Sequence, residues 1–157
     1  MSGSIDRGIL RDVPIVSRCD VHLGLVLSVY DGEISFEEWH DQIASVLDDP
    51  NWRYSTGSLS DMSTATLESL SDDDQARIFS LFDTRRLRVA GRRMVFVGTP
   101  ETRPVMKDIE AHTLASLGAR SAAFATLTPA CIWLGVDEQA VRTVIDELRA
   151  TLHTAGT

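Results

Sequence analysis

The sequence predicts a single-domain α/β protein with a mixed sheet of four to five strands, an N-terminal hairpin and crossover helices. The chain has 157 residues, the length of one domain. Strand-like apolar segments alternate with amphipathic helical segments, as in a sheet covered by helices. No repeat or linker divides the chain. We expect an N-terminal extension at 1–12, the domain at 13–152 and a C-terminal tail at 153–157.

The first two strands are predicted at residues 13–18 and 23–32. No helix separates them, so they should form an antiparallel hairpin. The period of two in the second strand puts alternate side chains on opposite faces of the sheet: Val26, Ser28 and Tyr30 on one, Leu25, Leu27 and Val29 on the other. The Asp31-Gly32 pair predicts a turn after this strand.

A well-specified helix follows. Ser35 and Glu38 have the spacing of a capping box, in which each side chain bonds the other's backbone amide. The apolar residues at helical spacing are Phe36, Trp39, Ile43, Val46 and Leu47. Asp48, Asp49 and Pro50 end the helix, and residues 52–62 are predicted as a third strand.

The second half continues the alternation. A helix is predicted over 72–88, capped by Ser71 and Asp74, with Ile78, Phe79 and Phe82 buried. A strand is expected over 92–99, a helix from Pro104 to Gly118 that buries Val105, Ile109 and Leu117, and one or two strands over 122–127 and 131–136. The last helix, over 137–152, should bury Val141, Val144, Ile145, Leu148 and Leu152.

The composition excludes several classes of function. Hydrophobic residues make up 43% of the chain and charged residues 24%, as in globular proteins. A net charge of −8 disfavours nucleic acids and anionic membranes as partners. No apolar run is long enough to span a membrane, and the N-terminus lacks the apolar stretch of a secretory signal, which predicts a cytoplasmic protein. Lys107 is the only lysine among many arginines, which indicates a GC-rich, bacterial coding sequence.

Four stretches resemble one known family. They are YDGEISFEEWHDQIASVLDDPNW (30–52), SLSDMS (58–63), GRRMVFVG (91–98) and IWLGVDEQAVRTVIDEL (132–148). Their order resembles the STAS-like (SpoIIAA-like) bacterial proteins, which have the fold of anti-sigma-factor antagonists. The resemblance covers about residues 13–152 and implies a four- to five-stranded mixed sheet with helices largely on one face. In the antagonists, the loop after the third strand carries a phosphorylatable serine in a D-S-S-G motif; residues 61–66 here lack the paired serines and the glycine.

The stretch SLSDMSTATLESLSDDDQARIF (58–79) is rich in hydroxyl and carboxylate side chains. Asp61 lies at the end of the predicted third strand, and Ser63, Thr64 and Thr66 follow it. Three roles are open to these four residues. In the first, they cap a helix or form a turn. In the second, they accept a phosphate or bind a partner, because a helix N-terminus stabilises negative charge. In the third, Asp61 orients a nucleophilic hydroxyl. We favour capping, and the four residues are the candidate partner-binding or phosphorylation site.

A dense basic patch is the second candidate site. It consists of Arg85, Arg86, Arg88, Arg92 and Arg93. Cations at a helix C-terminus complement the helix dipole. The alternative is a docking surface for an acidic or phosphorylated partner, because guanidinium groups pair well with such anions.

No catalytic, metal or cofactor site is predicted. The histidines His22, His40, His112 and His153 are scattered, without metal-ligand spacing and without a nucleophile motif. Cys19 and Cys131 are predicted to be free thiols, since a disulfide would require their two predicted strands to be neighbours.

The sequence therefore predicts a non-enzymatic regulatory or protein-interaction domain. It would dock a partner protein, or a second copy of itself as a homodimer, through the loop and helix after the third strand. The alternative is a carrier or sensor of a small apolar or lipid-like ligand held between the sheet and the helices.

Overall fold

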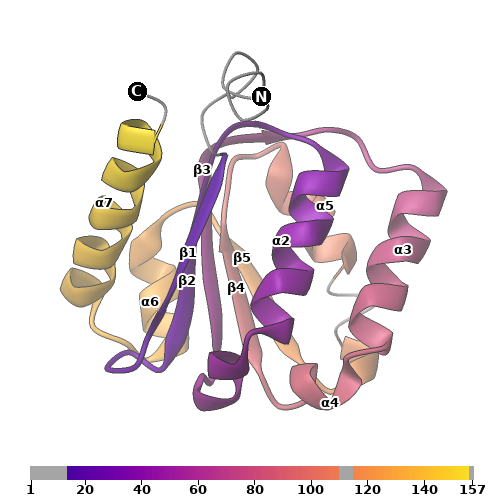
Figure 1. The fold of residues 1–157 in the computed structure, drawn as a ribbon, viewed down its shortest axis with the longest axis horizontal. Helices are drawn as coiled ribbons and strands as arrows, with labels where there is room; N and C mark the ends of the chain where they lie inside the picture. The colour runs from indigo at the N-terminus through magenta and orange to yellow at the C-terminus, as the bar shows by residue number, and fades with distance from the viewer. Residues whose placement is uncertain (1–13, 110–114, 156–157) are drawn as a thin grey trace, which may run out of the picture.

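The computed structural model describes residues 14–109 and 115–155, and the expected N-terminal extension at 1–12 lies outside them. A central five-stranded sheet lies between helices on its two faces (Figure 1). The strands are β1 (Ile15–Asp20), β2 (Leu25–Ile34), β3 (Gly57–Leu67), β4 (Arg93–Val97) and β5 (Arg120–Phe124). The helices are α2 (Phe36–Asp48), η1 (Pro50–Tyr54), α3 (Asp72–Asp83), α4 (Arg86–Val89), α5 (Thr102–Ile109), η3 (Ala115–Leu117), α6 (Leu127–Leu134) and α7 (Glu138–Ala155).

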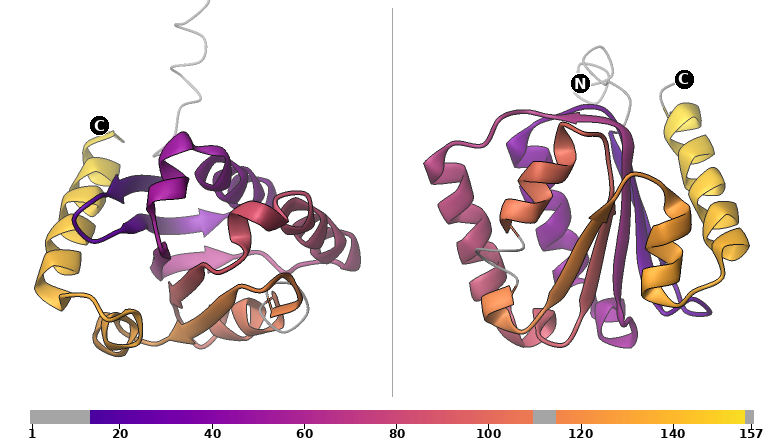
Figure 2. Two further views of the ribbon diagram at one scale, coloured as in Figure 1. Left: turned by 90° about the horizontal axis from the view of Figure 1, so that it is seen from below. Right: turned by 180° about the vertical axis from the view of Figure 1, so that it is seen from behind.

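The strands lie in the sheet in their order along the chain. β1 and β2 form the predicted antiparallel hairpin, and β2, β3, β4 and β5 are mutually parallel. Right-handed crossovers that all advance in one direction place their helices on one face of a sheet, here α2, α3 and α5. The helices α6 and α7 follow the last strand and cover the opposite face (Figure 2). The fold is thus a three-layer α/β domain, and the expectation of helices largely on one face is corrected.

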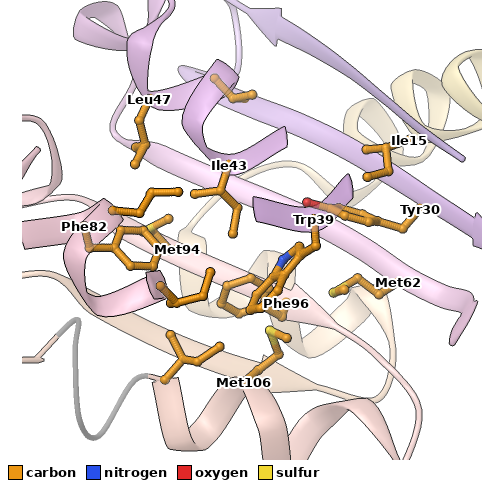
Figure 3. Packing of buried hydrophobic residues seen from close by; sticks show 14 of the residues in the cluster. Ile15, Tyr30, Trp39, Ile43, Leu47, Met62, Phe82, Met94, Phe96 and Met106 are labelled. Carbon is orange, nitrogen blue, oxygen red and sulfur yellow. The ribbon is translucent and has the colours of Figure 1, made fainter. Parts of the chain in front are cut away.

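The sheet separates two apolar clusters. On the face of α2, α3 and α5, β2 contributes Val26 and Tyr30 to a core that includes Trp39, Met62 and Phe96 (Figure 3). On the other face, Leu25, Leu27 and Val29 pack with α6 and α7. The predicted division of β2 between two faces is therefore confirmed.

The first and last long helices follow the prediction. Both hydrogen bonds of the Ser35–Glu38 capping box are present, and α2 ends at Asp48. Four of its predicted core residues are buried, and Val46 is partly buried. The five residues predicted to face inward from α7 are all buried: Val141, Val144, Ile145, Leu148 and Leu152. α7 continues to Ala155, into the expected tail.

The predicted boundaries of β2 and β3 are wrong. Asp31-Gly32 is not a turn, because β2 continues to Ile34 through an irregularity in its pairing with β3. Residues 50–54 form the 3-10 helix η1, begun by Pro50, and the Trp52 indole donates to the carbonyl of Arg88 at 2.7 Å. This buried contact outweighs the strand propensity of the aromatic residues.

The predicted helix over 72–88 is divided in two. Thr84 ends α3, and its hydroxyl donates to the carbonyl of Ser80 at 2.9 Å. Phe79 was predicted to be buried and is 41% exposed, whereas Leu81 is buried. Both residues lie beside Ile78 and Phe82 at helical spacing, so periodicity alone does not choose between them.

The predicted helix over 104–118 is also shorter. α5 begins two residues before Pro104 and ends at Ile109, and Leu117 lies in η3. Residues 110–114, with His112, lie outside the described part of the chain. Among the helices of residues 14–109 and 115–155, none has the combined length and hydrophobicity of a membrane span.

Residues 131–136 were predicted as a strand, and this is wrong. Most of them belong to α6, which ends where Gly135 adopts a left-handed conformation at φ +72°. A short apolar run fits a buried strand and a buried helix equally well. Cys131 is buried with the α7-side cluster, whereas Cys19 on β1 packs on the opposite side of the sheet, and both thiols are free.

Candidate functional site

The candidate residues Asp61, Ser63, Thr64 and Thr66 lie inside β3, not in a loop or at a helix N-terminus. β3 pairs with β4 only as far as Asp61, and beyond it continues beside β2 to Leu67. The capping interpretation of these four residues is therefore wrong. Ser71 provides the cap, with Asp74, at the start of α3.

Asp61 lies at the centre of a polar cluster at the C-terminal part of β3. Its side chain is buried and accepts a hydrogen bond from Arg149 of α7 at 2.9 Å and one from the backbone N–H of Ser63 at 3.0 Å. Arg149 also donates to the Thr64 hydroxyl at 2.8 Å, and it lies 3.8 Å from the Asp31 carboxylate. The Asp61 cluster, namely Asp31, Asp61, Ser63, Thr64 and Arg149, thus joins α7 to β2 and β3.

The cluster brings together Asp61, Ser63 and Thr64, three of the four predicted site residues. It adds Asp31 and Arg149, which the sequence did not suggest as site residues. Ser63, Thr64 and Thr66 are exposed, and Thr66 makes none of these contacts. Arg149 was missed because it follows the buried Leu148, where a cation on an amphipathic helix usually contacts solvent. The arrangement is that of an internal ion pair, which orients α7.

The five arginines of the basic patch bond mainly to the protein itself. Arg85 donates twice to the Asp48 carboxylate, at 2.8 and 3.0 Å, and this hydrogen bonding holds the pKa of Asp48 below its ordinary value. The other contacts are Arg86 with Asp83, Arg88 with the Leu47 carbonyl, Arg92 over the Trp52 ring and Arg93 with the Leu134 carbonyl. The interpretation as a site for an acidic partner stays a prediction.

A groove lies between α3 and α5. One of its walls is α3, the helix that follows the third strand, β3. The groove has a volume of about 460 Å³ and opens to solvent. We call it the α3–α5 groove; Ser69, Leu70, Gln75, Ala76, Phe79, Val105, Asp108 and Ile109 line it. The exposed ring of Phe79 forms part of its wall, where the sequence predicted a buried residue.

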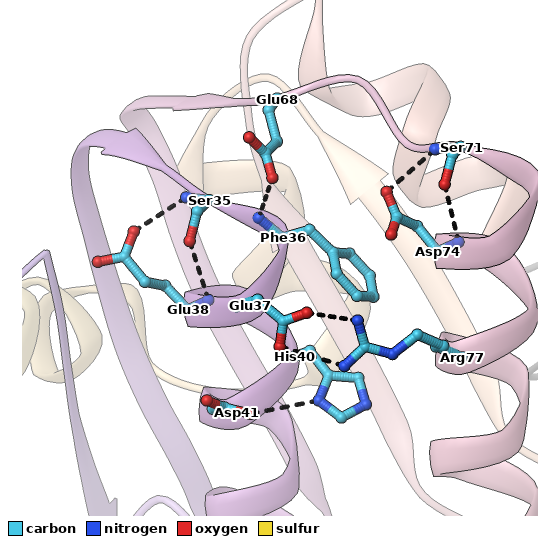
Figure 4. Close-up of polar contacts among 10 residues, drawn as sticks. All are labelled: Ser35, Phe36, Glu37, Glu38, His40, Asp41, Glu68, Ser71, Asp74 and Arg77. Atoms are coloured by element: carbon cyan, nitrogen blue, oxygen red, sulfur yellow. Dashed lines mark hydrogen bonds and ion pairs between the residues drawn. The ribbon is translucent and has the colours of Figure 1, made fainter.

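Contacts with α2 fix the position of α3, which forms one wall of this groove (Figure 4). Arg77 of α3 bonds both carboxylate oxygens of Glu37 on α2, one at 3.1 Å, and its guanidinium lies 4.9 Å from the centre of the Phe36 ring. The hydrogen bond from Arg77 lowers the pKa of Glu37. Glu68, which precedes α3, accepts a hydrogen bond from the backbone N–H of Phe36 at 2.6 Å.

The two histidines whose side chains the structure describes, His22 and His40, are not part of a common site. His22 is exposed, and His40 lies against Phe36 with its Nδ1 3.4 Å from Asp41. In the part of the chain that the structure describes, no group of three or more histidines, cysteines or acids has an arrangement that could hold a metal ion.

Comparisons with known proteins add a likeness of fold. No protein-family model matches the sequence, and no curated protein matches it. The chain is similar to the crystal structure of an uncharacterised protein of the DUF3478 family from Shewanella loihica PV-4, with 16% identity, a TM-score of 0.47, and coverage of 70% of this chain and 83% of that one. That protein is described as having a SpoIIAA-like fold, the fold that the sequence resemblance implies. Nothing about function follows from a likeness at this level.

Proposed function

We propose that this chain is a non-enzymatic protein-interaction domain that binds a partner protein through the α3–α5 groove. The observation that carries the proposal is the 41% exposure of Phe79 beside an open groove lined by Leu70, Val105 and Ile109. Aromatic residues at the centre of a surface patch contribute strongly to protein–protein binding. A groove of this kind accepts one or two apolar side chains of a partner.

The negative charge around the groove suggests which residues of the partner flank its apolar side chains. Asp108 lines the groove, and α3 begins with Asp72, Asp73 and Asp74. The whole chain carries a net charge of −8. A partner segment with an apolar side chain flanked by arginine or lysine is therefore favoured, because opposite charges accelerate association.

The same groove supports a second candidate function, the binding of a small apolar ligand. Its volume of about 460 Å³ lies within the range of roughly 300–1,000 Å³ found for ligand sites. The sequence interpretation placed such a ligand between the sheet and the helices, whereas this groove lies between two helices. Since ligand sites usually enclose most of the ligand, the openness of the groove favours a partner side chain.

Substitution of Phe79 tests the proposal. Phe79→Asp is expected to abolish the binding of a protein captured from the source organism and then purified, as measured by calorimetry. Leu87→Asp is the matched control, because Leu87 is 91% exposed on α4, outside the groove. Equal binding by wild type and Phe79→Asp would refute this docking site.

The intact mass of the protein, measured in native and denatured form, distinguishes partner docking from the binding of a small apolar ligand. It also shows whether a hydroxyl residue of the candidate site is phosphorylated. A mass that falls on denaturation indicates a carried ligand, and adding that ligand back should raise the melting temperature of wild type but not of Phe79→Asp. A covalent increment of one phosphate on Ser63, Thr64 or Thr66, the three exposed hydroxyl residues among the candidates, would support regulation by phosphorylation.

A further inference from the structure

The outer edge of β1 presents free backbone groups. Within residues 14–109 and 115–155, β1 pairs with β2 and with no other strand. Pro14 and Asp31 face each other where the two strands begin to pair. The backbone N–H of Asp31 donates to the Pro14 carbonyl at 2.9 Å, so they are a hydrogen-bonded pair of the ladder. Bonded and non-bonded pairs alternate along an antiparallel ladder. The N–H and C=O groups directed away from β2 are therefore those of Ile15, Ser17 and Cys19.

A groove runs along this free edge, and we call it the β1–α2 groove. Its volume is about 330 Å³. One wall is β1, from Ile15 to Cys19. The other wall is Gln42, Ser45, Val46 and Asp49, which share one helical face by their spacing, together with Asn51 and Trp52 of η1. A strand edge thus lies beside a helix, with space between them.

Polar side chains line the middle of the groove and its Cys19 end. Gln42 donates to the Ser17 hydroxyl, which lies 2.6 Å from the Ser28 hydroxyl. At the Cys19 end, burial raises the pKa of the thiol, and the nearby carboxylates of Asp49 and Asp20 raise it further. Asp49 lines the groove, so an incoming cation would meet its carboxylate there.

We propose that the β1–α2 groove binds an extended segment of a partner protein, which adds to the sheet as a further strand beside β1. The free groups of Ile15, Ser17 and Cys19 would bond its backbone, as in other cases of strand addition. Every second side chain of the segment would point toward α2. A lysine or arginine near the Cys19 end complements Asp49. This surface shares no residue with the α3–α5 groove, so the proposal does not depend on that site.

The test uses a displayed library of random dodecapeptides, selected on the folded chain. The affinity of each enriched peptide is then measured by fluorescence anisotropy for wild type and for two variants at one position. Cys19→Pro removes an outward N–H that β2 does not use, and proline is tolerated at such edge positions. Cys19→Ala removes the thiol and keeps the N–H. We expect Cys19→Pro to weaken binding by at least about tenfold and Cys19→Ala to leave it unchanged.

Amide hydrogen exchange in the wild-type protein gives a second measurement, which holds even if Cys19→Pro does not fold. Bound peptide should slow exchange at Ile15, Ser17 and Cys19, whose amides point away from β2, and leave Phe79 unaffected. The proposal is overturned if the library yields no binder, if the peptides bind Cys19→Pro as well as wild type, or if they protect the α3–α5 groove. It is also overturned if the chain dimerises and protects these amides without peptide, because a second copy would then occupy the edge.

Discussion

Arg149 of α7 donates a hydrogen bond at 2.9 Å to Asp61 of β3, although 88 positions separate them in the sequence. Only 5% of the Asp61 side chain and 24% of the Arg149 side chain are exposed. A carboxylate buried to this extent must have its charge compensated by a neighbour. The pair therefore links the last helix to the central strand.

Arg149→Met is expected to lower the free energy of unfolding by about 3 kcal/mol, because it leaves the buried Asp61 without its cation. Urea unfolding monitored by circular dichroism measures the change. The control on the same helix is Arg142→Met, which breaks an exposed pair with Glu138 and should change the free energy of unfolding by about 0.5 kcal/mol or less. Similar losses in the two variants would contradict this role for Asp61. The double variant Asp61→Leu/Arg149→Met should recover part of the loss, since apolar pairs can replace buried ion pairs.

The Asp48–Arg85 pair predicts a loss of stability in acid. The hydrogen bond from Arg85 lowers the pKa of Asp48 from its ordinary value of 3.8. Because the carboxylate is the favoured form in the folded state, the stabilisation is complete above pH 3.8 and is lost as the pH falls through the lowered pKa. Arg85→Gln should therefore reduce stability at pH 7, and the difference from wild type should vanish once Asp48 is protonated. Urea unfolding from pH 7 down through the pKa of Asp48 measures the difference in stability between Arg85→Gln and wild type. A difference that stays constant with pH would refute the assignment of this stabilisation to the Asp48 carboxylate.

Tyr30 predicts a loss of stability in alkali. Burial raises its pKa above the ordinary 10.0, and the hydrogen bond with Ser60 only partly opposes this. The unfolded chain ionises first, so the stabilisation is complete below pH 10.0 and declines above it. In Tyr54→Phe, where Tyr30 is the only tyrosine left, tyrosinate absorbance should appear together with the loss of tertiary circular dichroism. Tyrosinate that forms in the folded protein would contradict the burial of this hydroxyl.

Gly57 is predicted to be intolerant of any side chain. A Cβ at this position would lie 1.7 Å from the carbonyl oxygen of Arg93 on the neighbouring strand. Gly57→Ala should therefore destabilise the protein by more than about 3 kcal/mol, because the backbones of β3 and β4 must separate. At Gly32, where φ is +78° and the space is open, Gly32→Ala should cost about 1–2 kcal/mol for the left-handed backbone alone. Urea unfolding compares the loss of stability in Gly57→Ala with that in Gly32→Ala. Equal losses would refute the steric explanation for Gly57.

Local patterns were sufficient for much of the fold. The division of β2 between two faces, both capping boxes and the inward face of α7 follow from spacings of two to four residues, and the structure confirms them. Each of these features depends on neighbours in the sequence. The alternation of strands and helices gave the α/β class for the same reason.

The errors occurred where distant contacts decide the structure. The strand over Asp61–Leu67 exists because β2 extends alongside it, and the helix at Cys131 exists because its apolar face packs against α7 and the sheet. The α3–α5 groove depends on Phe79 facing outward, which helical spacing could not distinguish from Leu81. The partner of Asp61 could not be predicted, because no local pattern relates β3 to α7.

The position of α7 has a consequence for synthesis on the ribosome. Each strand from β2 to β5 pairs with the strand made just before it, so the sheet can assemble progressively as the chain emerges. The outer face of the first hairpin, with Leu25, Leu27 and Val29, is covered only once α7, which is translated after all five strands, has been made. Until then that face is open to chaperones and to other nascent chains. A chain that is truncated before Glu138 therefore carries a sheet on which Leu25, Leu27 and Val29 lack the cover that α7 provides.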